Sequence, residues 1–257
     1  MRIDADRNAV LVTGGSRGIG AAIVRALHAA GAQLTFTFVR DERSARTLAN
    51  ELGDRVAFER CDVGDAASLP GLVERCVARY GRIDALVNNA AIFAENAFDA
   101  DDYDAWRAGW EKTFAVNVFG AANLAYLAMR AMRSNPPDAR GTRGRIVNVA
   151  SRAAHRGETT FADYGASKAA LVNFGKSIAR GCASDGIVAF SIAPGFIETD
   201  MARAALDADG ETIRAEIPSG RVGSPEDVAA IVAFLASGAA DYATGTTVDV
   251  NGASYVR

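Results

Sequence analysis

A glycine-rich turn near the N-terminus, TGGSRGIG (13–20), separates an apolar run from a helix-like segment. The run AVLVT (9–13) predicts a buried strand, and the segment from about 18 to 30 predicts a helix. Glycine adopts backbone angles that other residues avoid, and it lets a ligand approach the chain closely. The unpaired amides and the dipole of a helix start favour a pyrophosphate. A tight turn without a ligand is the alternative, because a glycine pattern alone is a weak signal.

The same alternation of strand and helix continues along the chain. Further apolar runs predict strands at 34–39, 56–61, 84–89, 145–150, 187–193 and 246–250. Helix-length segments fall between them at about 41–52, 65–80, 99–133, 161–184 and 224–237. Two segments, 134–144 and about 198–220, are expected to be irregular. We therefore expect an α/β fold, a single Rossmann-type doubly wound domain over residues 1–257, with about seven parallel strands and helices on both faces.

The composition argues against several classes of protein. A net charge of -3 gives no reason to expect a nucleic acid or an anionic membrane as partner. Two His and three scattered Cys (Cys61, Cys76 and Cys182) predict no metal site, and reduced cysteines fit a cytoplasmic protein without a signal peptide. The longest strongly apolar stretch, 228–240, is too short to span a bilayer. It follows Ser224 and Pro225, which suit a helix start, and we expect a buried core helix.

A tyrosine and a lysine four residues apart occur in YGASK (Tyr164 to Lys168), within a predicted helix. Residues i and i+4 share one helix face, so the ring and the ammonium can approach each other. A neighbouring cation stabilises a phenolate and lowers the phenol pKa, which suits a group that works as acid and base. The alternative is a surface aromatic beside a surface charge, and the pair alone does not decide between them.

The end of the second predicted strand bears on which dinucleotide the turn would bind. An acidic residue there binds the ribose of NAD, whereas an Arg accommodates the 2′-phosphate of NADP. Here Phe38 and Val39 occupy the acidic positions, Arg40 follows, and Arg17 lies in the glycine turn. The acidic pair at 41–42 is expected to begin the next helix. We expect NADP(H) to be favoured over NAD(H); the alternative for Arg40 is a solvated charge at a helix entry.

Motifs spread in order over nearly the whole chain resemble those of the short-chain dehydrogenase/reductase family. Besides the turn and YGASK they are CDV (61–63), NNAA (88–91), VNVFG (116–120), NVAS (148–151), PGFIETDM (194–201) and the C-terminal RVGSPEDVAAIVAFLAS. The resemblance implies a Rossmann-type oxidoreductase that acts on CH–OH groups with NAD(P). It also implies a homotetramer, or a homodimer, that forms through the helices around 99–133 and 161–184.

The resemblance also implies roles for individual residues. Tyr164 would exchange the proton, Lys168 would lower its pKa together with the oxidised nicotinamide and bind the ribose, Ser151 would hold the substrate oxygen, and Asn117 would anchor a water. Cofactor contacts are implied for these two catalytic residues, Tyr164 and Lys168, and for Gly14, Ser16, Arg17, Gly18, Ile19, Gly20, Arg40, Asp62, Val63, Asn89, Ala90, Ala91, Pro194, Gly195, Ile197 and Thr199. Candidate substrate residues are Arg152, His155, Phe161 and Phe196, and the 198–216 segment is a candidate lid.

Within the family, the closest resemblance is to 3-oxoacyl-carrier-protein reductases, but three features depart from that pattern. Ala91 replaces the usual Gly of NNAG, and the 134–144 loop is longer. Asp185 stands where those enzymes use an Arg to hold the acidic carrier, and the other matching basic position is Arg143. Reversing one of two charges predicts weaker docking of an acidic protein.

We therefore expect an NADP(H)-dependent oxidoreductase for a small or medium ketone or secondary alcohol. The alternatives are a 3-oxoacyl-thioester reductase proper and an NAD-dependent alcohol or sugar dehydrogenase. A non-catalytic dinucleotide-binding regulator is disfavoured because Ser, Tyr and Lys are all present. A nucleotide-sugar epimerase, which also uses a YxxxK pair, is disfavoured by the short C-terminal part.

Overall fold

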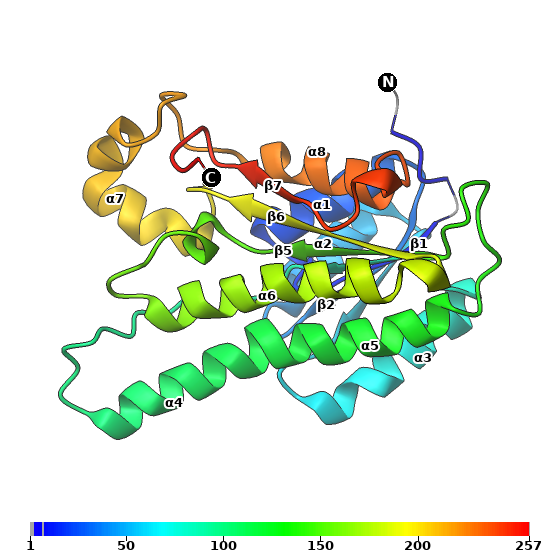
Figure 1. Cartoon of the computed structure of the whole chain (residues 1–257), viewed down its shortest axis with the longest axis horizontal. Helices are drawn as coiled ribbons and strands as arrows, with labels where there is room; N and C mark the ends of the chain where they lie inside the picture. Colours follow the sequence, from blue (N-terminus) through cyan, green and yellow to red (C-terminus); the bar gives the residue numbers. More distant parts are fainter. Residues whose placement is uncertain (1–2, 7, 257) are drawn as a thin grey trace.

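A computed structural model describes residues 3–6 and 8–256 and contains one parallel seven-stranded sheet (Figure 1). Its strands are β1 (Ala9–Val12), β2 (Gln33–Phe38), β3 (Val56–Arg60), β4 (Ala85–Asn88), β5 (Gly144–Val149), β6 (Ile187–Pro194) and β7 (Thr247–Val250). The strand order is β3-β2-β1-β4-β5-β6-β7, and every neighbouring pair is parallel. The predicted α/β fold is confirmed, and each predicted strand end lies within one residue of the observed end.

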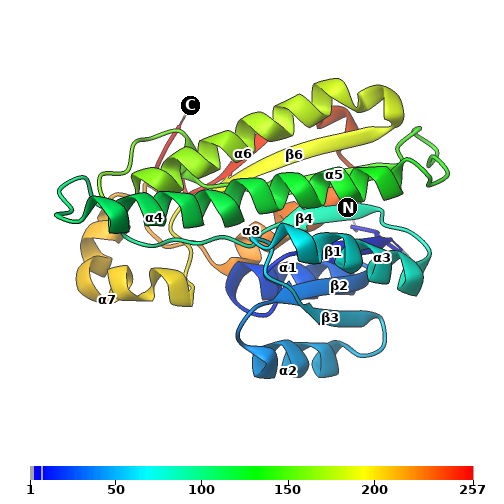
Figure 2. The same cartoon turned by 90° about the horizontal axis from the view of Figure 1, so that it is seen from below.

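Helices cover both faces of the sheet, as the doubly wound prediction requires (Figure 2). One face carries α1 (Gly18–Ala29), α2 (Glu42–Leu52) and α8 (Pro225–Ala236). The other carries α3 (Leu69–Tyr80), α5 (Ala121–Met132) and α6 (Ala162–Gly181). Successive side chains of a strand point to opposite faces, so Val10 and Val12 of β1 join the first cluster and Leu11 joins the second.

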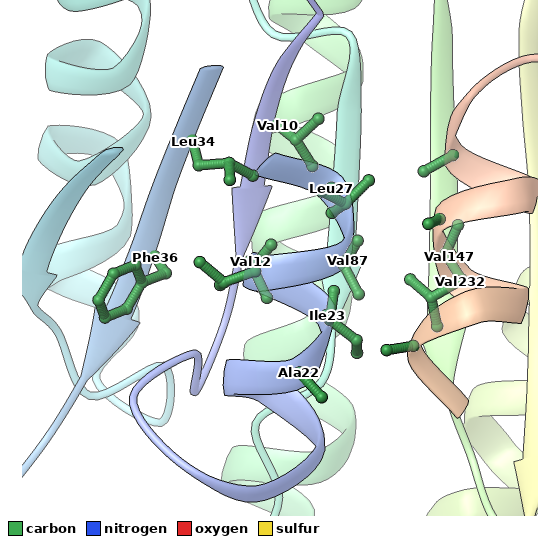
Figure 3. Packing of buried hydrophobic residues seen from close by; sticks show 14 of the residues in the cluster. Val10, Val12, Ala22, Ile23, Leu27, Leu34, Phe36, Val87, Val147 and Val232 are labelled. Carbon is green, nitrogen blue, oxygen red and sulfur yellow. The ribbon is translucent and has the colours of Figure 1, made fainter. Parts of the chain in front are cut away.

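The packing of α1 fixes the position of the glycine turn. Ile23 and Leu27 of α1 are fully buried against Val10, Val12 and neighbouring strand residues (Figure 3). Burying a side chain of this size contributes about 1.5–3 kcal/mol. Since β1 and α1 are both held in the core, the turn between them is fixed at the carboxyl end of β1.

The start of α8 follows the sequence prediction closely. The Ser224 side chain accepts a hydrogen bond from the Asp227 amide, the Asp227 carboxylate accepts one from the Ser224 amide, and Pro225 occupies the first turn. Val228, Val232 and Leu235 are buried, so the apolar stretch is a core helix as expected. Within the described ranges, no helix is both long and apolar enough to cross a membrane.

Two segments differ from the sequence prediction. The single helix expected at 99–133 consists of α4 (Tyr103–Phe114), a π-helical stretch (Ala115–Gly120) and α5. The segment expected to be irregular, about 198–220, contains the helix α7 (Asp200–Ala215), which is kinked at Asp209. The Asp-Ala-Asp-Gly run around the kink conceals an otherwise helical, Ala-rich pattern. Figure 1 shows α7 at the end of the molecule where β6 ends.

Short 3-10 helices complete the described structure. They are η1 (Ala66–Ser68), η3 (Arg152–Ala154), η4 (Ala183–Asp185) and η5 (Asp241–Ala243). Of these, η3 follows β5 directly and therefore lies at the carboxyl edge of the sheet, next to the predicted catalytic residues.

Candidate active site

The glycine turn is joined to the end of β4 at the point where the strand order reverses. The Thr13 hydroxyl accepts hydrogen bonds from the amides of Asn89 and Ala90, both at 2.9 Å. The Asn89 side chain donates to the carbonyls of Thr13 at 2.9 Å and Gly14 at 3.1 Å. Ligands of open parallel sheets bind in the crevice at such a reversal point, outside the carboxyl ends of the strands.

The turn itself fits a pyrophosphate. A Cβ at Gly20 would lie 2.1 Å from the Gly14 carbonyl oxygen, so this tight turn requires glycine there. Gly18 has a φ of +53, and a Cβ on it would project to 3.4 Å from the Thr199 methyl group. The N-cap residue of α1, Arg17, makes no side-chain cap, which leaves the first amides of the helix for a ligand. The residues present here fit a dinucleotide.

Basic side chains surround the place where the predicted adenosine end would lie. Arg17 and Arg40 are exposed, and Arg17 lines a cavity of about 410 Å³ together with Arg43, near the starts of α1, α2 and α8. Asp41 caps α2 by accepting hydrogen bonds from the Ser44 amide at 2.9 Å and hydroxyl at 2.6 Å. The acidic pair therefore begins the helix, as expected, and Arg43 is a basic residue that the sequence analysis missed.

The predicted adenine-binding segment follows β3. Asp62 is exposed and accepts a hydrogen bond from the Gly64 amide at 2.9 Å, while Val63 is buried. A Cβ at Gly120 would lie 2.5 Å from the Val63 carbonyl oxygen, so Gly120 allows the π-helical stretch to pack against this segment. The loop after β6 completes this side: Ile197 is buried, and Thr199 faces Gly18.

Ser151, Tyr164 and Lys168 lie together at the carboxyl end of β5. Ser151 caps η3, where its hydroxyl accepts a hydrogen bond from the Ala153 amide at 3.1 Å, and it also hydrogen-bonds the Tyr164 phenol. Tyr164 lies in the first turn of α6. The Lys168 ammonium is 5.5 Å from the centre of the Tyr164 ring and donates to the Val149 carbonyl at 2.8 Å. The phenol and the ammonium thus share one helix face.

Burial dominates the pKa values of Tyr164 and Lys168. Burial raises the pKa of Tyr164 to about 12, although the hydrogen bond with Ser151 opposes the rise and Glu158 adds to it. Burial also lowers the pKa of Lys168 to about 8. The lowering of the phenol pKa that the resemblance implies requires an oxidised nicotinamide beside Lys168, so it stays a prediction.

Asn117 connects the loop after β4 to α6. Its side-chain oxygen accepts from the Ile92 amide at 2.8 Å, and its side-chain nitrogen donates to the Ile92 carbonyl and the Ser167 hydroxyl, both at 3.0 Å. The Ser167 hydroxyl in turn donates to the Tyr164 carbonyl at 2.7 Å. Because the amide already makes these bonds, a water at this residue would be held by the main chain. Ser167 was not predicted from the sequence, although it lies three residues after Tyr164 within YGASK.

A buried carboxylate, also missed, supports the start of α6. The Thr113 hydroxyl donates to Asp163 at 2.6 Å, and the other Asp163 oxygen accepts from the Tyr164 amide at 2.8 Å. A carboxylate in the first turn of a helix is stabilised by the helix dipole. Its position directly before Tyr164, at the predicted helix start, is the sequence signal. Asp163 therefore helps to orient the backbone that carries the phenol.

The candidate substrate residues make three separate sets of contacts. Phe161 stacks on Phe93, with 4.1 Å between ring centres, and Phe93 meets the edge of Tyr164 at 4.9 Å. The Arg152 guanidinium lies 4.5 Å above the Phe196 ring. His155 stacks on the C-terminal Tyr255 at 6.0 Å, and the Tyr255 hydroxyl donates to the His155 carbonyl at 3.2 Å. Phe93 and Tyr255 were not predicted from the sequence, because each contacts these residues only through tertiary packing.

Asp185 and Arg143 occupy the two positions that were compared with carrier-binding arginines. Asp185 forms an ion pair with Arg133 at 2.8 Å. Arg143 turns back onto its own loop and donates to the Asn135 carbonyl. The first position therefore presents no cation, and the cation at the second bonds its own loop. Elsewhere in the part of the chain that the structure describes, no cluster of three or more His, Cys, Asp or Glu could hold a metal.

Comparison with known proteins places this geometry in context. Residues 14–253 match the family model described as "Enoyl-(Acyl carrier protein) reductase". The chain is 39% identical to the 3-oxoacyl-(acyl-carrier-protein) reductase of Salmonella typhimurium, over 96% of both chains. It is 37% identical to the acetoacetyl-CoA reductase of Shinella zoogloeoides, over 95% of this chain and 97% of that one. A crystal structure of a short-chain dehydrogenase/reductase from Brucella melitensis, described as a glucose/ribitol dehydrogenase, superposes with a TM-score of 0.90 at 31% identity over 100% of both chains.

Proposed function

Since the chain belongs to the short-chain dehydrogenase/reductase family, we propose that it is an NADP(H)-dependent oxidoreductase that interconverts a ketone and a secondary alcohol. The observation that carries the proposal is the placement of Ser151, Tyr164 and Lys168 beside a turn that fits a dinucleotide. When bound, NADPH supplies the hydride to the carbonyl carbon. The residues of the chain then have to bind the carbonyl oxygen and give it a proton.

The Tyr164 phenol suits the proton transfer. Its raised pKa keeps it protonated at neutral pH, so it can donate to the oxygen as the carbonyl is reduced. Ser151, already bonded to the phenol, would share that oxygen and stabilise the negative charge that develops on it. The Lys168 ammonium would turn partly away from the Val149 carbonyl to bind the ribose. A water held by the Asn117 main chain would return a proton to Lys168.

Three arginines support NADP(H) over NAD(H). Arg17, Arg40 and Arg43 lie around the starts of α1 and α2, where the 2′-phosphate is expected. An arginine fork recognises a phosphate through charge-assisted hydrogen bonds. Asp41, whose carboxylate caps α2, is a poor partner for a ribose 2′-hydroxyl.

A reductase of 3-oxoacyl thioesters is the second candidate, because two relatives carry names of that kind. The ion pair between Asp185 and Arg133 argues against an acidic carrier protein as its usual substrate. We also propose that the chain forms a homotetramer, or a homodimer, through its α4–α6 side. A monomeric mass by light scattering would contradict that assembly.

The test is turnover of a panel of ketones and secondary alcohols with NADPH, NADH and their oxidised forms. We expect net oxidation or reduction of the cofactor, with NADP(H) preferred. The Tyr164→Phe variant should lose about 10²–10⁴-fold in kcat while its Kd for NADPH stays within about twofold of the wild-type value. Cofactor binding without any turnover, or a Tyr164→Phe variant of near-native activity, would overturn the proposal.

A further inference from the structure

Arg152 is a buried cation that the proposed chemistry does not use. It follows Ser151 directly, and the residue is 6% exposed. Its Nη1 is buried and has no hydrogen-bond partner among the described residues. No carboxylate of the described residues lies within ion-pair distance of the guanidinium, which instead lies above the Phe196 ring. A buried charge without a partner is costly, so its presence beside the reacting groups calls for a ligand.

The position of Arg152 places this cation at the substrate end of the site. Ser151 and Arg152 follow β5, and Phe196 follows β6, the neighbouring parallel strand. The guanidinium therefore spans the carboxyl ends of two adjacent strands, at the edge where ligands of such sheets bind. Phe196 belongs to the loop whose Thr199 faces the glycine turn.

From this geometry we infer that the substrate carries a carboxylate close to its carbonyl or hydroxyl carbon, and that Arg152 binds it. The substrate class is thus an oxo acid or the corresponding hydroxy acid. An arginine presents two parallel N–H groups that match the two oxygens of a carboxylate. This inference rests on the proposed function, because it names the substrate of the same site.

The charges around Arg152 favour a monoanion over a phosphate. Burial lowers the pKa of Arg152, and Arg156 lowers it further, whereas Glu158 and Glu216 raise it. An arginine stays protonated in spite of such a shift. One carboxylate would neutralise the single guanidinium, but a dianionic phosphate would add a charge that Glu158 and Glu216 repel.

The experiment measures kcat/KM with NADPH for 2-, 3- and 4-oxo acids and for their methyl esters, which keep the same skeleton without the charge. The wild type should prefer at least one acid over its ester by about 10–100-fold, as a charged hydrogen-bonded pair implies. Arg152→Met should remove that preference: kcat/KM for the acid should fall, and kcat/KM for the ester should stay within about threefold of the wild-type value. Arg152→Lys, which keeps the charge without the fork, should restore part of the preference.

Arg156→Met is the matched control. Arg156 lies on the same segment and pairs with Glu158 at 3.7 Å, so its removal should change the acid-to-ester ratio by less than about threefold. Equal rates for acids and esters in the wild type would overturn the inference and leave the proposed function standing. An Arg152→Met variant that loses acids and esters equally would also overturn it, because Arg152 would then only position the Phe196 loop.

A binding measurement separates this inference from the proposed function. Calorimetric titration of the same oxo acids into the protein with NADP⁺ does not depend on turnover. Binding of an acid but not its ester, lost in Arg152→Met, would support the inference even if no carbonyl were reduced. Absence of binding to the wild type would contradict it.

Discussion

Two buried cations near opposite ends of β5 have contrasting surroundings. Arg145, at the start of the strand, is 6% exposed and donates to both oxygens of Asp241, at 2.9 and 2.6 Å, and to Asp138 at 2.5 Å. Lys168, at the other end, is 2% exposed and donates to the carbonyl of Val149. The first cation is surrounded by carboxylates, whereas no ion pair of the described residues includes the second.

The difference separates structural charge from functional charge. Burial lowers the pKa of Arg145, but its bonds with Asp241 and Asp138 outweigh that effect and raise it overall. At Lys168 burial is the dominant influence, and it lowers the pKa to about 8. Arg145 is thus neutralised within the protein and joins β5 to η5 and the 134–143 loop. Lys168 and Arg152 stay without a carboxylate partner at the edge where the cofactor and substrate are proposed to bind.

The substitution Arg145→Met should have the largest effect on stability. Removing the guanidinium leaves Asp241 buried and unpaired, which should lower the free energy of unfolding by about 3–5 kcal/mol. Urea unfolding measures the change. At a temperature where the variant is folded, kcat should stay within about threefold of the wild type, because Arg145 lies far from the carboxyl edge.

A paired substitution controls for the charge. The double variant Arg145→Met/Asp241→Asn lacks both the guanidinium and the Asp241 carboxylate charge, so it should recover part of the lost stability. Equal stability of the single and double variants would show that Asp241 is not the source of the cost.

The pH dependence of activity should also distinguish Lys168 from Arg145. Lys168 loses its proton as the pH rises through about 8, whereas Arg145 stays charged throughout. If the ammonium binds the ribose, kcat/KM for NADPH, which reports the free enzyme, should fall up to tenfold per pH unit above about 8. Circular dichroism over the same range would check that the fold is retained. A flat profile up to pH 10 would contradict this role.

A smaller effect is expected for the exposed cations near α2. Replacing Arg40 or Arg43 with Met should weaken NADPH binding by about tenfold and leave NADH within about twofold, since only the phosphate is lost as a partner. Fluorescence titration gives both constants. Arg46→Met, in the same helix and paired with Glu42 at 2.5 Å, is the matched control and should change neither constant. An equal loss of affinity for NADPH and NADH would show that these residues do not recognise the 2′-phosphate.

Much of the fold was predictable because its signals are local. Apolar runs mark the strands, and Ser224 with Pro225 marks the start of α8. The π-helical stretch was not predictable, because Asn117 is held by Ile92, which lies 25 residues away. The helix α7 was missed because the residues at its kink, around Asp209, favour a turn in isolation.

The residues of the candidate site could be proposed from the sequence, but their burial and pKa values could not. The spacing in YGASK places Tyr164 and Lys168 on one face of α6. It contains no information on burial, which raises the pKa of the Tyr164 phenol to about 12. The burial of Arg152, like the contact of Tyr255 with His155, arises from segments far apart in the sequence. Local pattern thus gives the chemistry of the groups, and tertiary packing sets their charge states.

We propose that Lys168 is kept buried without a carboxylate partner, at a cost in stability, because its ammonium serves the proposed reaction. Its lowered pKa means that the folded protein binds this proton more weakly than the unfolded chain does. The cost is fully present below about pH 8 and disappears as the pH approaches the ordinary lysine value. At pH 7 the lowered pKa corresponds to a destabilisation of about 3 kcal/mol. A Lys168→Met variant would remove this cost but would leave the Val149 carbonyl without its hydrogen bond, which costs about 1–2 kcal/mol.

The decisive measurement is therefore urea unfolding and turnover of Lys168→Met at pH 7, each compared with the wild type. We expect a variant that is more stable by about 1–2 kcal/mol and at least 100-fold slower with its best carbonyl substrate. A variant that is less stable than the wild type, or that retains near-native turnover, would contradict it.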